Sequence, residues 1–440
     1  MKIYDSLTNK NIELVTNKIT IYNCGPTVYN DVHIGNIRPV ITFDVLHRLL
    51  LAYGFNVQMI HNITDIDDKI INRSQELNIS ESEVSNIYHK NYLEILKTFR
   101  IPYSNYVMPK VSDNIDGIIE YIQKLINVNA AYTTPTGDVY FDVNKIKNYG
   151  CLSHQNIDEL KINTRSTIAN DKKSPLDFVL WKTTNNGLKW YSPWSTGRPG
   201  WHTECAYFIN KYCVDHVTIH GGGIDLKFPH HENENAQNNA LFNRNIADIW
   251  MHVGHINVNN EKMAKSANNF ILVKDILKTF APNIIRWFMF STKYQNPLNY
   301  SLEILQQTKK DFIKFVKNIN LVCIEAHTKN HPVKFNLEAK AIPDFLLALQ
   351  DDLDFPNAIA AIHKQAKQLM GLLKAKKYDE LQQSMNSIYK SLFIIGIEIY
   401  HPMEQPAISS LIIEWKSAID RKDYVLADKY RSQLEKKGII

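Results

Sequence analysis

Residues 19–63 read ITIYNCGPTVYNDVHIGNIRPVITFDVLHRLLLAYGFNVQMIHNI, and this stretch decides the fold. Its first six residues predict a short buried strand, and the Gly-Pro pair that follows predicts a turn. Apolar residues then recur at helical spacing over 37–50, until Gly54 stops them. Apolar residues at alternate positions predict a second strand over 57–63. The stretch therefore predicts a βαβ unit with parallel strands, and such sheets bind ligands at the strand ends, where Cys24 lies.

The α/β pattern returns after residue 200. A strand is predicted over 215–220, running into three consecutive glycines, and it is followed by a polar helix over 231–242 and a further strand over 249–258. From about residue 282, apolar residues at helical spacing predict a helix bundle. The fold class is therefore α/β: a Rossmann-like parallel-sheet domain with an inserted connective segment, followed by an α-helical bundle. These changes of pattern divide the chain into five segments: 1–100, 101–200, 201–281, 282–400 and 401–440.

The composition is that of an ordinary globular chain. Of the 440 residues, 44% are apolar and 22% are charged, which excludes a disordered or fibrous protein. At about 150 residues per domain, the length allows roughly three domains. The formal net charge is +5, which neither requires nor excludes a nucleic-acid partner.

The sequence predicts neither a membrane span nor a disulfide framework. The longest apolar runs are far shorter than the ~20 residues that a membrane helix needs. Asp5 lies where the apolar core of a secretory leader should begin, so a cytoplasmic location is expected. The five cysteines are odd in number and widely spaced, which indicates buried thiols or metal ligands.

The loop over 26–36 is a candidate phosphate site. It lies between a strand end and a helix start, where free backbone N–H groups and the helix dipole favour anions. His33 could donate a hydrogen bond to a phosphate, and Gly35 would let a nucleotide approach the backbone. In a single His-x-Gly tripeptide, taken alone, the histidine more often has only a packing role.

A basic loop over 261–266 follows the last predicted strand. Lys262 and Lys265 could neutralise the charge that develops on a phosphoryl leaving group. Taken alone, such a loop is more often a solvated charged turn. Its occurrence together with the loop over 26–36 strengthens the catalytic interpretation.

Four residues could form a metal site. His230 and Glu234 are spaced i and i+4 and are predicted to share one helix face. With Cys24 and Cys205 they make a plausible zinc set of two thiolates, one imidazole and one carboxylate. Each residue also has an ordinary structural meaning, since cysteines are often buried apolar residues and His–Glu pairs often lie on surfaces. The residues alone leave both interpretations open.

Five ordered blocks resemble the class I aminoacyl-tRNA synthetases, and more narrowly the cysteinyl-tRNA synthetases. HIGN and KMAKS are similar to the two signature motifs of the class, usually written HIGH and KMSKS. The other three blocks resemble the cysteinyl family, and the resemblance runs from about residue 3 to 438. The blocks are 22–29 (YNCGPTVY), 33–36 (HIGN), 200–205 (GWHTEC), 221–234 (GGGIDLKFPHHENE) and 262–266 (KMAKS).

The resemblance implies one zinc ion per chain, held by Cys24, Cys205, His230 and Glu234, with the substrate thiolate joining the metal. Zinc prefers a soft sulfur to a serine hydroxyl, so discrimination takes place at binding. A site built around one strongly bonding group rejects analogues by ~10⁴ or more, which makes editing unnecessary. Because four protein ligands normally close a zinc site, the metal is expected to expand its coordination or Glu234 to yield to the thiolate.

The resemblance also implies an ATP site and a tRNA partner. Thr27 would line the cysteine pocket and Trp201 would form its floor. The residues expected to act on ATP and Mg²⁺ are His33 and Asn36 at the phosphates, Gly35 beside them, Asp225 at the ribose or the substrate amine, and Lys262 and Lys265 at the pyrophosphate. Segments 1–100 and 201–281 would form the catalytic domain, 101–200 the connective insertion, 282–400 the tRNA-side bundle and 401–440 a short anticodon-binding segment. The expected partners are L-cysteine, ATP and tRNA(Cys), and the expected state is a monomer.

The chain departs from the family pattern at three places. Asn36 replaces the second histidine of the first motif, which predicts a weaker phosphate donor rather than loss of activity. Ala264 replaces a serine of the second motif, and residues 267–268 read Ala-Asn where Leu-Gly is common, which puts the mobility of that loop in doubt. The chain also ends where many relatives continue into a short extension, so anticodon contacts from it would be missing.

Two other functions compete with tRNA charging. One is a related ligase that makes cysteinyl-adenylate but transfers cysteine to an amino sugar; the long helical C-terminal region argues against it. The other is a catalytically silent RNA-binding paralogue, which would be expected to lose chemical residues that this chain retains. Charging of tRNA is the favoured hypothesis.

Overall fold

The computed structural model describes residues 1–155, 171–214, 216–263, 269–399 and 402–440. The chain divides into two compact units. The first comprises Met1–Ile256 and Met263–Ile276, and the second comprises Asn257–Lys262 and Leu277–Ile440. The finer division into five segments stays a prediction.

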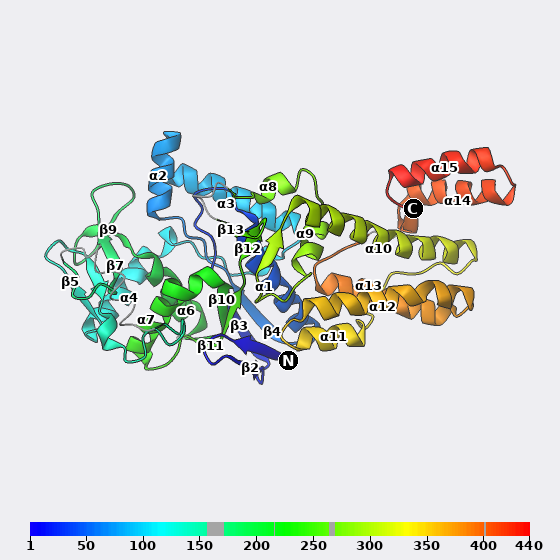
Figure 1. Ribbon diagram of the computed structural model, residues 1–440. Coiled ribbons are helices and arrows are strands. Elements are labelled where there is room, and N and C mark those ends of the chain that lie inside the picture. Colours follow the sequence, from blue (N-terminus) through cyan, green and yellow to red (C-terminus); the bar gives the residue numbers. More distant parts are fainter. Residues whose placement is uncertain (156–170, 215, 264–268, 400–401) are drawn as a thin grey trace. The chain divides into compact units, whose positions relative to one another are not determined.

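A four-stranded parallel sheet forms the centre of the first unit. The strand order is β11-β10-β3-β4, and every neighbouring pair is parallel. Sheet neighbours β3 and β10 thus come from distant parts of the sequence (Figure 1). The parallel α/β prediction is confirmed. The strands are β3 (Lys18–Asn23), β4 (Asn56–Ile60), β10 (Val217–Gly223) and β11 (Ala247–Val253).

Helix α1 (Ile34–Ala52) connects β3 to β4 and completes the predicted βαβ unit. Most of its residues are buried, including Arg38 and Asp44. The helix ends just before Gly54, whose φ of 82° lies in the left-handed region that glycine tolerates best. The predicted helix stop at this glycine is confirmed.

The single strand predicted over 249–258 is wrong, because the chain forms two strands there. β11 ends at Val253, and β12 (Ile256–Val258) joins β13 (Glu261–Lys262) and β14 (Leu298–Tyr300) in a separate sheet. The Arg38 guanidinium donates to the carbonyl oxygens of Gly254 and His255, at 2.8 and 3.1 Å. These hydrogen bonds stabilise the break between the two strands.

Segment 101–200 contains an antiparallel sheet of its own, whose strand order is β5-β6-β7-β9-β8. This sheet follows α4 (Ile115–Asn127) and leads into α6 (Trp201–Cys213). Its strands are β5 (Ala131–Thr133), β6 (Val139–Phe141), β7 (Phe178–Thr183), β8 (Trp190–Tyr191) and β9 (Thr196–Pro199). The rest of the first unit contains β1 (Lys2–Asp5), β2 (Lys10–Glu13), α2 (Asp68–Leu77), α3 (Glu81–Thr98), α7 (Glu232–Phe242) and α8 (Val273–Ile276).

The second unit is mainly helical, as predicted. Its last two helices form a hairpin with a small core that includes Ile324, Leu411 and Leu434. The helices are α9 (Pro282–Met289), α10 (Leu302–Thr328), α11 (Pro343–Gln350), α12 (Phe355–Lys374), α13 (Tyr378–Ile394), α14 (Pro406–Asp420) and α15 (Tyr424–Lys436). Among the described residues, no helix combines the length and the apolar character that crossing a bilayer requires.

Candidate active site and metal centre

A cavity of about 580 Å³ opens at the carboxyl ends of β3 and β10. This is the edge of a parallel sheet at which ligands are expected to bind. Most of the residues predicted for the site contribute to its wall. They are Cys24, Thr27, His33, Gly35, Asn36, Trp201 and Asp225.

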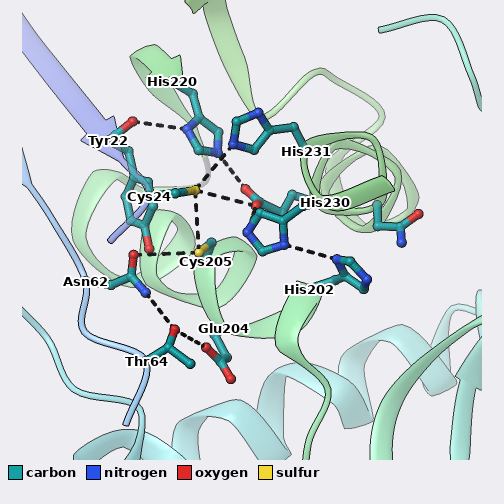
Figure 2. A network of polar contacts seen from close by, with 12 residues as sticks. Tyr22, Cys24, Asn62, Thr64, His202, Glu204, Cys205, His220, His230 and His231 are labelled. Atoms are coloured by element: carbon teal, nitrogen blue, oxygen red, sulfur yellow. Dashed lines mark hydrogen bonds and ion pairs between the residues drawn. The ribbon is translucent and has the colours of Figure 1, made fainter. Parts of the chain in front are cut away.

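Two cysteines meet at one side of this cavity. Cys24 comes directly after β3, and its N–H donates to the carbonyl oxygen of Gly221 on β10 at 3.1 Å. Cys205 lies on α6 and is buried. The two Sγ atoms are 3.8 Å apart (Figure 2). Two Zn–S bonds of about 2.3 Å at a tetrahedral angle require a separation of about 3.8 Å, so this pair fits one zinc ion.

His230 and Glu234 complete the predicted quartet. The His230 Nε2 atom lies 2.8 Å from Glu234 Oε1, and the donor atoms of all four residues lie within 4.8 Å of one another. His230 lies in a short π-helical segment, Lys227–His231, that leads directly into α7 at Glu232. The predicted i, i+4 pairing of His230 with Glu234 is therefore confirmed.

A second group of donors shares two members with the first. Cys24, His220, His231 and Glu234 also place one donor atom each within 4.8 Å of the others. His220 Nε2 lies 2.5 Å from Glu234 Oε2, and His231 Nε2 lies 3.4 Å from Cys24 Sγ. Because the groups share a thiol and a carboxylate, they describe alternative sites for one ion. Zinc prefers soft thiolate ligands, which favours the quartet with two cysteines.

The histidines of this second group lie behind the quartet and orient it. His220 Nδ1 is 3.1 Å from the carbonyl oxygen of Tyr22, and His231 Nδ1 is 2.9 Å from His252 Nε2. These three histidines were not predicted as site residues from the sequence. The adjacent pair in HHENE was a signal for His231, whereas His220 and His252 are brought in only by the pairing of β10 with β11.

The charges at the quartet form a buried ion-pair network. Burial alone would raise the pKa of Cys205, but hydrogen bonds with Cys24 and His230 lower this pKa to about 6. Burial and the neighbouring Cys205 raise the pKa of Cys24 well above its ordinary value. Burial opposes ionisation of Glu234 and His230 as well, yet their mutual attraction lowers the pKa of Glu234 to about 2 and raises that of His230 to about 10. A metal ion would therefore displace protons from Cys24 and His230 on binding.

Trp201 contacts a predicted metal ligand directly. Its ring stacks on the His230 imidazole, with centroids 4.0 Å apart and planes 19° apart. The His230 imidazole also contacts His202, whose Nδ1 atom lies 3.0 Å from the Nδ1 atom of His230. Trp201 thus lines the cavity and also fixes the orientation of an imidazole ligand.

The opposite part of the cavity contains the start of α1. The Asn36 side-chain oxygen accepts a hydrogen bond from the His33 backbone N–H at 3.1 Å, so Asn36, at the third helical position, forms a capping box with the N-cap residue His33. An antiparallel bridge pairs His33 with Leu272, and the Phe270 ring packs edge-on against His33 at 4.8 Å. A Cβ on Gly35 would lie 2.8 Å from the terminal methyl group of Met263 and 3.0 Å from the His33 ring, so a larger residue there would have to displace these side chains.

The two lysines of the second motif are placed differently. Lys262 lies exposed on β13 in the second unit. Lys265 falls outside the described residues, as do Ala264, Ala267 and Asn268. The expected contacts of both lysines with pyrophosphate stay predictions.

The wall of the cavity also includes residues for which no role was predicted. His61 is buried between the Asn23 carbonyl oxygen, 2.8 Å from its Nδ1, and the Tyr92 hydroxyl, 2.6 Å from its Nε2. The Lys69 ammonium lies over the Tyr29 ring, 5.6 Å from its centroid. No motif marked His61, Lys69 or Tyr92, because they reach the cavity from the end of β4 and from helices α2 and α3.

Comparison with known proteins identifies similar sequences. The family model described as tRNA synthetases class I (C) catalytic domain matches residues 10–310. A protein named cysteine–tRNA ligase from Malacoplasma penetrans (strain HF-2) is 46% identical over 443 residues, covering 100% of both chains. A protein of the same name from Ureaplasma parvum serovar 3 is 45% identical over 447 residues, again covering 100% of both chains.

Solved structures share the fold at low sequence identity. A methionyl-tRNA synthetase of Mycobacterium tuberculosis, in complex with methionyl-adenylate, aligns with a TM-score of 0.62 and 12% identity. The alignment covers 90% of this chain and 91% of that one. A LeuRS–tRNA–LeuAMS complex of Agrobacterium radiobacter K84 aligns with a TM-score of 0.64 and 9% identity, covering 90% and 85%.

Proposed function

Since the chain belongs to the cysteine–tRNA ligases of the class I tRNA synthetases, and therefore attaches cysteine to tRNA(Cys), we propose that it selects cysteine through a zinc ion and activates it as cysteinyl-adenylate. The observation that carries the proposal is the convergence of Cys24, Cys205, His230 and Glu234 within 4.8 Å, with Cys24 in the wall of the cavity. A bound zinc ion supplies a preference for sulfur over a hydroxyl oxygen. The side chains around it decide how cysteine is oriented.

Cysteine would occupy the part of the cavity between the quartet and Thr27. Trp201 would form the floor and hold the His230 ring, and Asp225 at the rim would accept a hydrogen bond from the substrate amine or the ribose. The buried thiolate and carboxylate of the quartet favour a cation there. The amino acid would thus be fixed at both ends before reaction.

ATP would bind at the start of α1, with its phosphates at His33, Gly35 and Asn36 and with Mg²⁺. The helix N-terminus favours negative charge, and the Asn36 amide group remains able to donate because the cap uses only its oxygen. The cysteine carboxylate would attack the α-phosphorus, and the bond to pyrophosphate would break. Lys262 and Lys265 would stabilise the charge on that leaving group.

The adenylate would then pass its cysteinyl group to the terminal ribose of tRNA, releasing AMP. Positioning and charge stabilisation suffice for both steps, so no protein nucleophile is needed. A zinc-based choice at binding explains how the enzyme rejects serine without an editing step. A monomeric state and a cytoplasmic location stay predictions.

Charging of unfractionated tRNA with labelled cysteine, with ATP and excess unlabelled serine, tests the proposal. Cysteine on tRNA, accompanied by about one zinc per chain and by cysteine-dependent pyrophosphate exchange, is the expected result. Exchange without charging would instead favour the ligase that transfers cysteine to an amino sugar. Active enzyme that contains no zinc would refute the zinc-based selection.

A further inference from the structure

We infer that Glu204, Thr64 and Asn62 form a positioning chain that sets the separation of the two cysteine ligands. The inference rests on the proposed zinc function and extends it to residues that contact neither ATP nor tRNA in that proposal. It concerns a geometric problem, because the two ligands come from elements that are distant in sequence. Cys24 ends β3, whereas Cys205 lies on α6.

The positioning chain of side chains begins on α6, at Glu204, the residue next to Cys205. The Thr64 hydroxyl donates to Glu204 Oε2 at 2.8 Å and accepts from the Asn62 side-chain nitrogen at 3.3 Å (Figure 2). The Asn62 side-chain oxygen accepts from the Gly25 backbone N–H at 2.9 Å. Gly25 directly follows Cys24. Three hydrogen bonds thus connect the neighbour of one ligand to the neighbour of the other.

The same chain touches the second thiol directly. The Asn62 side-chain oxygen lies 3.8 Å from the Sγ atom of Cys205. Glu204, Thr64 and Asn62 are each only 1% exposed, so water cannot easily replace a missing partner. A buried donor or acceptor without a partner costs more than the net gain from an ordinary hydrogen bond. The chain is therefore a rigid connection between α6 and the end of β3.

Backbone contacts reinforce this connection. Val28 N–H donates to the Thr64 carbonyl oxygen at 3.1 Å, and Thr64 N–H donates to the Pro26 carbonyl oxygen at 3.2 Å. A Cβ on Gly25 would lie 1.6 Å from the Asn62 carbonyl oxygen, so the two loops pack without room for a side chain. The loop that carries Cys24 can move only if residues 62–64 move, and the side chain of Thr64 fixes these to α6.

Metal binding makes this rigidity useful. Ligand distances must be correct to about 0.2 Å, and residues that orient ligands typically change metal affinity by 10- to 100-fold. Loss of the Thr64 hydroxyl would let the Cys24 loop drift relative to Cys205. Zinc binding and thiol selection would then suffer, whereas the ATP site at the start of α1 would not.

The test compares Thr64→Val, which keeps the shape but removes the hydroxyl, with Thr64→Ser, which restores it. Zinc release to a chelator and the KM values for cysteine and ATP in pyrophosphate exchange are measured for both variants. We expect Thr64→Val to release zinc at least tenfold faster and to raise the cysteine KM about tenfold, with the ATP KM within twofold of wild type. Thr64→Ser should lie within about threefold of wild type in each quantity.

A second pair of variants, at Glu204, tests the same role if Thr64→Val fails to fold. Glu204→Met removes the acceptor at similar volume, and Glu204→Gln retains an acceptor oxygen. The same contrast between the two variants is expected. Equal zinc release for Thr64→Val and Thr64→Ser, or equal rises in the KM values for cysteine and ATP, would overturn the positioning role. If wild type itself contains no zinc, the proposed function fails, so the two failures are distinguishable.

Discussion

The Sγ atoms of Cys24 and Cys205 lie 3.8 Å apart, although 181 positions separate them in the sequence. Cys24 directly follows β3 and Cys205 lies on α6, whose first residue, Trp201, lines the same cavity as Cys24. The separation equals that of two thiolates on one tetrahedral zinc ion. The proposed zinc site depends on this distance between the two Sγ atoms.

Replacing Cys205 by Ser should remove the bound zinc and the activation of cysteine together. Loss of a direct ligand should weaken zinc binding by more than about 100-fold, since residues that only orient ligands already contribute 10- to 100-fold. Metal analysis and cysteine-dependent pyrophosphate exchange measure both effects. Cys213→Ser, on the same helix α6, is the matched control and should retain zinc. Full zinc occupancy in Cys205→Ser would exclude Cys205 as a ligand.

Replacing Trp201 by Ala should raise the KM for cysteine about tenfold. The stacked ring orients His230, and an aromatic pair of this kind contributes about 0.5–1.5 kcal/mol, the upper end of which corresponds to tenfold. Trp201→Phe retains a stacking ring and should lie within about threefold of wild type. Pyrophosphate exchange at varied cysteine concentration measures this difference. Identical KM values for the two variants would argue against a role for the stacking.

Asn36 should serve two separable purposes. Its oxygen caps α1 through the His33 N–H, and its amide is proposed to donate to phosphate. Asn36→Asp keeps the cap but places a negative charge beside the phosphates, so the ATP KM should rise at least tenfold while thermal stability stays near wild type. Asn36→Ala should also lower the free energy of unfolding by about 1 kcal/mol, because the hydrogen bond to the His33 N–H is lost. An unchanged ATP KM in both variants would remove Asn36 from the ATP site.

Much of this site could be predicted from the sequence. The βαβ unit follows from local apolar periodicity, and the quartet follows from residue chemistry together with family resemblance. The role of Asn36 as a helix cap was not predicted, because it depends on the backbone conformation at His33. The expectation of a weaker phosphate donor considered only its side-chain chemistry.

Other features depend on contacts between distant segments. His220 on β10 and His252 on β11 lie near each other because these two strands pair. The register of parallel strands cannot be read from the sequence alone. The strand break at Gly254 depends on Arg38, which is remote in sequence. Thr64 and Glu204 carry no motif that links them. Such pairings are a property of the packed fold rather than of any local pattern.

Acid should destabilise the protein through His61. Burial lowers the pKa of His61 to about 4, although its bond to the Asn23 carbonyl opposes this shift. Between pH ~6.5 and ~4 the unfolded chain binds a proton that the folded protein does not, so stability falls as the pH is lowered. At about 1.4 kcal/mol per pKa unit, the loss reaches about 3 kcal/mol near pH 4.

Denaturant unfolding at several pH values measures this effect, with His61→Gln as the comparison. The variant lacks the titrating group, so its unfolding should take up as much as one proton fewer between pH ~6.5 and ~4. Its free energy of unfolding should therefore depend on pH less steeply in this range. The other buried histidines will contribute equally to both proteins. Parallel pH profiles for wild type and variant would show that His61 does not titrate as described.

The most direct test of the zinc account is X-ray absorption at the zinc edge, on the zinc-loaded protein with and without cysteine. The account predicts two sulfur ligands from Cys24 and Cys205, and one further sulfur when cysteine is added but none when serine is added. A spectrum with fewer than two sulfur ligands, or one that cysteine leaves unchanged, would contradict it.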